Sequence, residues 1–463
     1  MSIATPTFFF FAAIIIAINI ISKQKYTSIL LLLASLAFYA MWNIYAPIFI
    51  IAYVVLNYLF AFFIEKRPKI GLILALIINV GIFLVFARFY TLLGSTWLVK
   101  FIAPLGFSYY MFRVLGYLID VSIGRTKPEK SLIKFMLFIS FFPVLVMGPI
   151  TRSTEFFAEV DARKCPNLKT FADSMILIAL ALLKKYVFAD NIARQINPMF
   201  ENSSIQNGAV WFLILLCFVI QLYLDFSAYT DIALSVSKML GITINPNFRA
   251  PFLARNISDF WRRWHMSLSS WLSDYIFLPL QLKLRNLGVL ASVIAAFVTL
   301  IVSGLWHGTL NYLIFSVFMA AFISIDALVA KRRRKLEKKA PKILFKVVTI
   351  TATFVIVVLL EVFVRGRDPK QSFDILSMIF NPMSYSNPGG SKTLLMYFIL
   401  SVPVVILSHY LELNAQNLNR ITAKLSQIPY VVRVGLALIL AYIFIFFGYF
   451  NGDIVGGFLY AKF

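Results

Sequence analysis

Long apolar runs recur along this chain and constrain its fold more than any other feature. They lie near residues 7–22, 28–64, 68–90, 131–149, 171–189, 209–225, 287–304, 310–330, 343–364, 394–411 and 431–450. About 20 apolar residues in a helix cross the hydrocarbon core of a bilayer, which is ~30 Å thick. The run 28–64 is too long for one crossing and contains Trp42, Asn43 and Pro47, so we expect two helices joined by a tight turn. The sequence therefore predicts an all-α polytopic membrane protein with about eleven transmembrane helices.

Composition and charge agree with a lipid environment. Hydrophobic residues make up 60% of the 463 positions and charged residues only 14%, which excludes an ordinary soluble domain. The net charge of +23 resides in short basic stretches between apolar runs, such as Lys66–Lys69 and Lys331–Lys339. This distribution indicates the positive-inside rule and contact with anionic lipid rather than nucleic acid. We expect both stretches to face the cytoplasm, and the first run to remain as a helix rather than to be removed as a signal peptide.

Two stretches depart from the pattern of apolar helix followed by charged loop. Residues 103–154 carry Pro104, Gly106, Pro143, Gly148 and Pro149 within largely apolar sequence. Residues 245–274 combine several charged side chains with tryptophans. Broken backbone at membrane depth persists only where protein or a wet cavity surrounds it. We therefore expect both stretches to form re-entrant or interfacial walls of a site.

Two of the three histidines, His265 and His307, lie where charge, tryptophan and glycine gather. Imidazole gains and loses protons near neutral pH, so histidine commonly activates a hydroxyl group as a general base. His307 lies between Gly304 and Gly308, whose small size would let a substrate or a second helix come close. A buried imidazole that serves packing alone is an equally good interpretation of this spacing.

His265 belongs to residues 256–272, which the spacing predicts to be one amphipathic helix with an apolar stripe. That stripe comprises Trp261, Trp264, Leu268, Trp271 and Leu272. Asp259 precedes Arg262 by three residues and Arg263 by four, so ion pairs within the helix are expected. The two arginines either extend to lipid head groups or hold a phosphate group of a donor. An aromatic belt at the membrane interface is the competing interpretation of the tryptophans.

A third polar element interrupts the apolar run 221–241. Gln221, Asp225 and Tyr229 recur at four-residue steps and so share one helix face, which suits a buried network that orients a histidine or an arginine. For Asp231 a packing role is the better interpretation. The sequence contains no nucleotide-binding glycine loop, HExxH or CxxC motif, and no GxSxG elbow for a serine nucleophile.

Five ordered blocks of sequence resemble the membrane-bound O-acyltransferase family. Within that family they are similar to the bacterial branch of alginate and peptidoglycan O-acetylation and teichoic-acid D-alanylation proteins. The blocks are APLGFSYYMFRVLGYLIDV (103–121), FFPVLVMGPITRSTEF (141–156), YLDFSAYTDIALSVSKMLGI (223–242), NFRAPFLARNISDFWRRWHMSLSSWLSDYIFLPL (247–280) and SGLWHGTLNYLIF (303–315). One departure concerns residues 281–288, QLKLRNLG, where acetylation proteins commonly carry a Gly-Gly-Asn-Arg turn. This difference weakens the assignment of a particular substrate, but not the assignment to the family.

The resemblance implies that His307 is the catalytic histidine and that His265 occupies the second polar position of the site. It implies a ring of transmembrane helices around a central tunnel, within one domain spanning 1–463. We expect the core at about 100–330 and peripheral helices at 1–95 and 340–463. Around the histidines, we expect six side chains to bind or orient the substrates: Asp225, Tyr229, Arg262, Arg263, Trp264 and Trp306.

The expected donor is acyl-CoA, and acetyl-CoA in particular, with no bound cofactor or metal. The expected acceptor is an extracytoplasmic protein or polysaccharide, and the expected location is the bacterial cytoplasmic membrane. His307 would act as general base or carry the acyl group transiently. A transporter or channel for an anionic solute, with the same side chains lining a pathway, is the alternative function.

Overall fold

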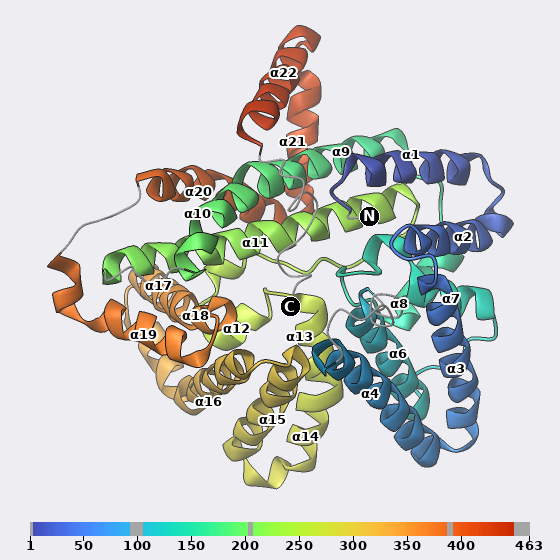
Figure 1. Cartoon of the computed structure of the whole chain (residues 1–463), viewed down its shortest axis with the longest axis horizontal. Coiled ribbons are helices and arrows are strands. Elements are labelled where there is room, and N and C mark those ends of the chain that lie inside the picture. Colours follow the sequence, from blue (N-terminus) through green and yellow to red (C-terminus); the bar gives the residue numbers. More distant parts are fainter. Residues whose placement is uncertain (1–2, 93–104, 202–206, 387–391, 449–463) are drawn as a thin grey trace. The chain divides into compact units, whose positions relative to one another are not determined.

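Helices account for the regular structure in the part of the chain that the computed structural model describes, residues 3–92, 105–201, 207–386 and 392–448 (Figure 1). Seven of its helical segments are long and apolar enough to cross a membrane. They are Ala46–Lys66, Pro68–Phe86, Gly208–Met239, Val289–His307, Leu310–Lys339, Lys342–Arg365 and Lys392–Leu413. The protein is thus an all-α polytopic membrane protein.

Several of the eleven predicted runs form shorter or interrupted helices. The first run is the 16-residue helix α1 (Pro6–Ile21), and the run 131–149 begins as the nine-residue helix α7 (Leu132–Ser140). The run 171–189 changes from α-helix to π-helix after Leu182. The division of the run 28–64 is confirmed, because α2 (Thr27–Ala40) and α3 (Ala46–Lys66) flank a turn at residues 41–45. Hydrophobicity alone therefore located apolar segments better than it located complete crossings.

The chain divides into two compact units, and the boundary passes through helix α11 (Gly208–Met239) between Ala228 and Tyr229. The first unit comprises the described residues of 1–179 and residues 229–246. Besides α1, α2, α3 and α7, its helices are α4 (Pro68–Leu92), α6 (Phe107–Ser122), α8 (Ser153–Asp161) and most of α9 (Leu168–Leu182). Helix α3 packs against α2, α4, α6 and α7, which places it at the centre of this bundle.

The predicted break within residues 103–154 is confirmed in its described part; Ala103 and Pro104 lie outside the described residues. Gly106 begins α6 with a left-handed φ of 73°, and a Cβ there would lie 2.7 Å from the carbonyl oxygen of Leu145. After α7, a 3-10 turn at Phe142–Val144 leads into non-helical backbone up to Ser153. The unwound backbone passes directly against Gly106, which explains the glycine.

A buried arginine satisfies the carbonyl groups that this break exposes. Arg113 of α6 is 1% exposed and donates to the carbonyl oxygens of Ile139, at 3.2 Å, and of Phe138 and Val144. The side chain thus supplies the donors that the interrupted helix lacks.

A second buried arginine ties three distant parts of the first unit together. Arg163 donates to the carbonyl oxygens of Asn19 at 3.1 Å and Leu240 at 3.0 Å, and to the Thr27 hydroxyl at 2.8 Å. The Asn19 amide also donates to Leu240, at 3.1 Å. This cluster joins α1, α2 and the end of α11.

The second unit comprises the described residues of 180–228 and 247–448. Its helices after the π-helix Leu183–Ala189 (η3) are α10 (Asp190–Glu201), the first part of α11, α12 (Ile257–Trp261), α13 (Met266–Leu272), α14 (Leu278–Lys283), α15 (Val289–His307), α16 (Leu310–Lys339), α17 (Lys342–Leu360), α18 (Val362–Arg365), α19 (Pro369–Phe380), α20 (Lys392–Leu413), α21 (Ala415–Gln427) and α22 (Tyr430–Phe447).

Helices α15 and α16 form a tight helical hairpin. A Cβ on Gly304 would lie 2.8 Å from the Ser316 hydroxyl oxygen, so the predicted close approach of a second helix is confirmed. Gly308 ends α15 with a φ of 78°, and the Thr309 side chain accepts the Tyr312 N–H at the start of α16. Gly308, which ends α15, and Thr309, the N-cap of α16, together place His307 at the turn of the hairpin.

Replacing Arg163 with methionine should destabilise the protein by about 3 kcal/mol, because several hydrogen bonds from a charged donor are lost in a buried cluster. The midpoint of thermal unfolding of the purified protein measures this loss. Arg367→Met is the control, since the Arg367 side chain is 71% exposed and its partner Asp368, at 3.1 Å, is 42% exposed. An exposed pair contributes little to stability, so the midpoint of this variant should stay near that of the wild type. Equal midpoints for the two variants would contradict the structural role of Arg163.

Candidate active site

His307 is the last residue of α15, and aromatic rings hold its imidazole. The Tyr312 ring stacks on it with centroids 4.1 Å apart and an interplanar angle of 11°. The Trp306 ring centroid lies 4.3 Å from that of His307. The residue is half-buried, so it combines a fixed ring with partial access. These are properties that a general base needs, since it must be oriented and also reachable.

His265 lies in a break between two short helices, which corrects the prediction of one helix over 256–272. Helix α12 ends at Trp261 and α13 begins at Met266, and His265 itself has a left-handed φ of 44°. The apolar stripe is nevertheless largely buried: Trp264, Leu268, Trp271 and Leu272 are at most 7% exposed, while Trp261 is half-buried. The periodicity identified the buried face correctly but could not reveal the break.

The environment of His265 favours an uncharged imidazole. The side chain is 1% exposed, and the Phe226 ring meets it edge-on with centroids 4.9 Å apart. Burial lowers the pKa of His265 below its ordinary value, and a positive charge on His307 would lower that pKa further. The two histidines therefore lie within electrostatic range of one another. A neutral His265 suits hydrogen bonding to a substrate better than attraction of an anion.

Aromatic side chains form a continuous series of ring contacts from one histidine toward the other. From His307 the series passes through Tyr312 to Phe315 (6.5 Å) and from Phe315 to Trp261 (6.4 Å). It continues through Phe260, which contacts Trp261 at 5.7 Å and stacks on Trp264 at 5.6 Å. Trp264, Phe248, Phe226 and His265 complete it. Trp264 thus belongs to this series, and Trp306 contacts the His307 ring at its start.

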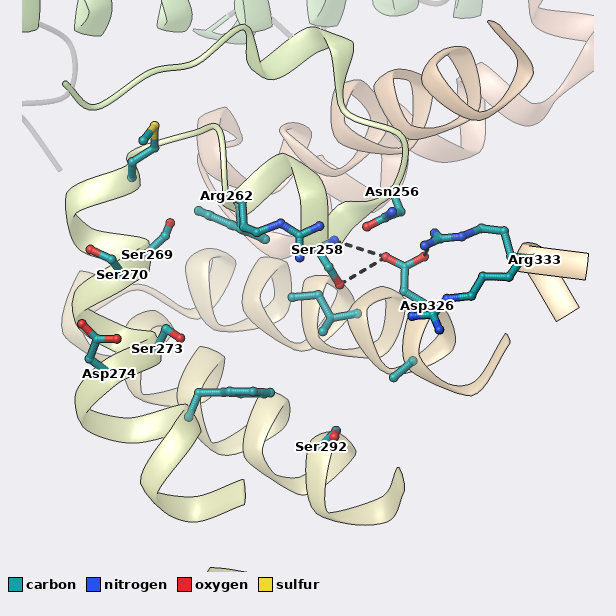
Figure 2. Close-up of a pocket in the computed structure, with 16 residues that line it drawn as sticks. Asn256, Ser258, Arg262, Ser269, Ser270, Ser273, Asp274, Ser292, Asp326 and Arg333 are labelled. Atoms are coloured by element: carbon teal, nitrogen blue, oxygen red, sulfur yellow. Dashed lines mark hydrogen bonds and ion pairs between the residues drawn. The ribbon is translucent and has the colours of Figure 1, made fainter. Parts of the chain in front are cut away.

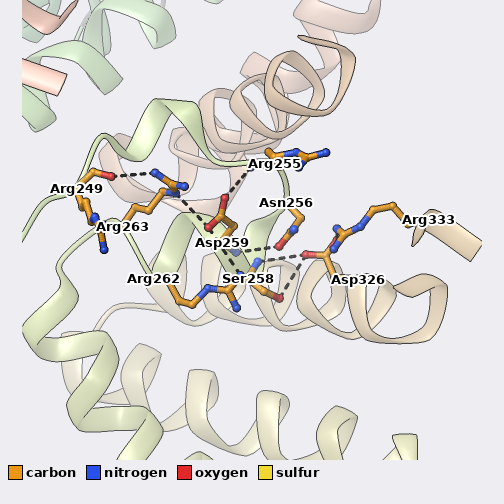
Figure 3. Close-up of polar contacts among 9 residues, drawn as sticks. All are labelled: Arg249, Arg255, Asn256, Ser258, Asp259, Arg262, Arg263, Asp326 and Arg333. Atoms are coloured by element: carbon orange, nitrogen blue, oxygen red, sulfur yellow. Dashed lines mark hydrogen bonds and ion pairs between the residues drawn. The ribbon is translucent and has the colours of Figure 1, made fainter. Parts of the chain in front are cut away.

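The predicted ion pairs of Asp259 are present (Figure 3). Asp259 lies 3.1 Å from Nε of Arg263 and 3.7 Å from Arg262. Arg263 is the more buried of the two and also donates to the carbonyl oxygen of Arg249 at 3.2 Å. The Arg262 side chain is 69% exposed, so its guanidinium has room to meet a ligand.

Arg262 lies at a pocket of about 720 Å³ within the second unit (Figure 2). Hydroxyl groups and charged side chains line much of it, among them Ser258, Ser269, Ser270, Ser273, Asp274, Ser292, Asp326, Arg333 and Arg334. Asp326 accepts the Ser258 N–H at 3.2 Å and lies 3.7 Å from Arg333. Trp261 also lines the pocket and begins the route of ring contacts to His307, although the lining contains neither histidine.

Asp225 and Tyr229 belong to different networks, although they share a helix face. Oδ1 of Asp225 lies 2.8 Å from Nζ of Lys185, which lies 2.8 Å from Oδ1 of Asp190. These three side chains are at most 5% exposed. Tyr229 belongs to the first unit, where its hydroxyl accepts the Met147 N–H at 3.2 Å beside the unwound segment.

The sequence analysis missed Lys185 as part of a buried charge cluster. Two adjacent lysines inside the apolar run 171–189 were the available signal. Lys185 and Asp190 are five residues apart and would diverge on an α-helix, but at the end of the π-helix Leu183–Ala189 the Asp190 N–H donates to the carbonyl oxygen of Lys185. The π-helix therefore brings the pair onto one face, and Asp225 completes the cluster.

The described residues contain no group of three or more His, Cys, Asp or Glu side chains that could hold a metal ion. Their long apolar helices define the class as a polytopic membrane protein, in which His307 at a helix end is the candidate acid–base group. The sequence profile of the membrane-bound O-acyltransferase family matches residues 128–364, about half of the chain. The protein therefore belongs to that family, and its enzyme class is acyltransferase.

Named relatives indicate which branch of the family this chain is similar to. The chain is 30% identical over 330 residues to a probable alginate O-acetylase AlgI of Pseudomonas fluorescens, covering 69% of this chain and 64% of that protein. It is 29% identical over 388 residues to a peptidoglycan O-acetyltransferase of Helicobacter pylori, covering 75% and 72%. It is 30% identical over 266 residues to a teichoic acid D-alanyltransferase of Streptococcus thermophilus, covering 54% and 63%. Their names concern acyl groups on polymers of the cell surface.

The backbone at His265 generates a test with three substitutions. We expect His265→Asn to retain part of the activity, because asparagine adopts left-handed φ readily and its amide can hydrogen-bond. His265→Ala should lose activity about 100-fold and also stability. His265→Gly should keep stability, since glycine has no strain at this φ, yet lose activity like alanine. Rates of acyl transfer and thermal midpoints measure these effects; equal inactivation by all three changes would instead indicate proton transfer by His265.

Proposed function

We propose that this protein transfers an acetyl group from acetyl-CoA on the cytoplasmic side of the bacterial inner membrane to an extracytoplasmic hydroxyl group. The acceptor would be a partner protein or a polysaccharide of the cell surface. Family membership and the names of the relatives support an acyl donor and a surface acceptor. The observation that carries the proposal is the placement of His307: its ring is fixed by Tyr312 and Trp306, half-buried, and within range of His265.

In the proposed reaction the oxygen of the acceptor hydroxyl attacks the thioester carbonyl, and His307 takes the proton of that hydroxyl. The carbon–sulfur bond then breaks, and the departing thiolate receives that proton to become the free thiol of CoA. His265 would hydrogen-bond the donor or the acceptor and hold it beside His307. This route requires His307 to be reached from both membrane faces, which stays a prediction.

The pocket beside Arg262 is the proposed entrance for the donor. Three arginines line it, Arg262, Arg333 and Arg334, and the last two belong to the basic run that we expect in the cytoplasm. Guanidinium groups bind phosphate oxygens with charge-assisted hydrogen bonds, and CoA carries three phosphate groups on the part remote from the thioester. Trp261 lines this pocket and also belongs to the series of ring contacts between the histidines.

His307→Ala and His307→Gln should abolish release of CoA thiol from acetyl-CoA while the protein still inserts and folds. The loss follows because neither side chain can accept the hydroxyl proton at that position. Thiol release by purified protein with an acceptor, together with the thermal midpoint, measures both parts. A transporter would release no thiol in the wild type. Wild-type rates in a stable His307 variant would contradict the assignment.

Arg262→Ala should raise the KM for acetyl-CoA about tenfold with little change in kcat, because the lost contact lies away from the reacting carbonyl. The same variant should behave like the wild type toward acetyl-pantetheine, which lacks the phosphates. Arg285→Ala is the control, since Arg285 is exposed and outside the pocket. Equal losses with both donors would contradict phosphate binding by Arg262.

A further inference from the structure

Two non-glycine residues in the described part of the chain have left-handed backbone, Ala250 with a φ of 51° and His265 with a φ of 44°. Such conformations cost on the order of 1–3 kcal/mol each and persist only where neighbouring groups enforce them. One of these residues is the second histidine of the candidate active site. The contacts that hold the other residue therefore bear on the position of His265.

The segment just before Ala250 is hydrogen-bonded to the backbone on both sides of His265. The Met266 N–H donates to the carbonyl oxygen of Asn247 at 2.9 Å, and the Arg249 N–H donates to that of Arg263 at 2.9 Å. Figure 3 shows the Arg249 carbonyl meeting the Arg263 side chain as well. The buried Asn247 side chain accepts the Ser267 hydroxyl at 2.6 Å. Through these hydrogen bonds, residues 247–249 hold the non-helical segment that contains His265 in place.

Glu412, near the end of α20, holds Ala250, the residue that directly follows this segment. Its Oε2 accepts the N–H of Ala250 at 2.7 Å, and its Oε1 accepts the Tyr223 hydroxyl at 2.6 Å. Tyr223 and Ala250 are fully buried, and the Tyr223 ring contacts Phe248 at 5.7 Å. Hydrogen bonds to a carboxylate are about twice as strong as those between neutral groups. Glu412 therefore holds Ala250 through one oxygen and is itself oriented through the other.

We propose that Glu412 is a positioning residue for His265. It holds Ala250 in its left-handed conformation, so that residues 247–249 stay in register with residues 263–267 and present the imidazole at a fixed place. Glu412 takes no part in bond making. The expected change in kcat rests on the proposed function, whereas the expected change in the backbone around His265 does not depend on it.

The test combines kinetics with amide hydrogen exchange in the full-length protein. Glu412→Ala should lower kcat about 10- to 100-fold, as expected for a displaced catalytic group, with little change in the KM for acetyl-CoA. The amides of Arg249 and Met266 should exchange faster. Glu412→Gln should restore most of the rate, because its carbonyl oxygen can accept from Ala250 and its amide can donate to Tyr223.

Adding Ala250→Gly to Glu412→Ala should also recover part of the rate, since glycine adopts left-handed backbone without help. Should Glu412→Ala fail to fold, Tyr223→Phe removes one of the two hydrogen bonds and should produce a smaller version of both effects. Glu337→Ala is the control, because it removes a half-exposed carboxylate paired with Arg255 at 2.6 Å, and it should keep wild-type kcat and exchange.

Normal kcat and exchange in a folded Glu412→Ala protein would overturn the proposal. A loss that neither Glu412→Gln nor Ala250→Gly relieves would overturn it as well, because a general packing defect would then explain the loss. If the wild type shows no acyl transfer, the proposed function fails, and the exchange of Arg249 and Met266 still decides whether Glu412 holds this segment.

Discussion

Backbone N–H and C=O groups at membrane depth need partners within the protein, and the rest of this structure depends on how that requirement is met. Continuous helices meet it alone. Where a helix is interrupted, a side chain from elsewhere in the same unit supplies the missing partner. Arg113 donates to carbonyl groups at the end of α7 and just beyond it, and Glu412 accepts the N–H of Ala250. The charged residue is buried in the first case and half-buried in the second, and each one completes backbone that is not helical.

The candidate active site uses these interruptions. His265 lies between α12 and α13, and His307 lies at the turn between α15 and α16. Histidines at helix ends can be directed away from the helix axis while the helices themselves remain packed. Ring contacts hold both imidazoles, from Tyr312 and Trp306 at His307 and from Phe226 at His265, and proton transfer requires an oriented base. Packing of the surrounding rings is thus the means by which both imidazoles are oriented in the proposed reaction.

Sequence reasoning was most successful where local pattern decides the structure. Apolar length predicted the helices, the spacing of Asp259 to Arg262 and Arg263 predicted their ion pairs, and Gly304 indicated the close approach of α16. It failed at the break around His265, because the left-handed backbone there depends on Asn247, which pairs through tertiary contacts. It also missed the cluster of Lys185 with Asp190 and Asp225, because residues five apart lie on different faces of an α-helix and Asp225 comes from a distant part of the chain. The roles of the histidines and arginines stay predictions.

The π-helix Leu183–Ala189 gives the length of this segment a chemical meaning. The π-helix contains one residue more than an α-helix would need to bring Lys185 and Asp190 onto the same face. Deletion of one residue between them would give a four-residue spacing, which an ordinary α-helix also places on one face. Insertion of one residue would give a six-residue spacing, which places the two side chains on different faces of an α-helix. Lys185 could then no longer meet both Asp190 and Asp225. This segment should therefore accept a shorter chain more readily than a longer one, a preference that its apolar composition does not reveal.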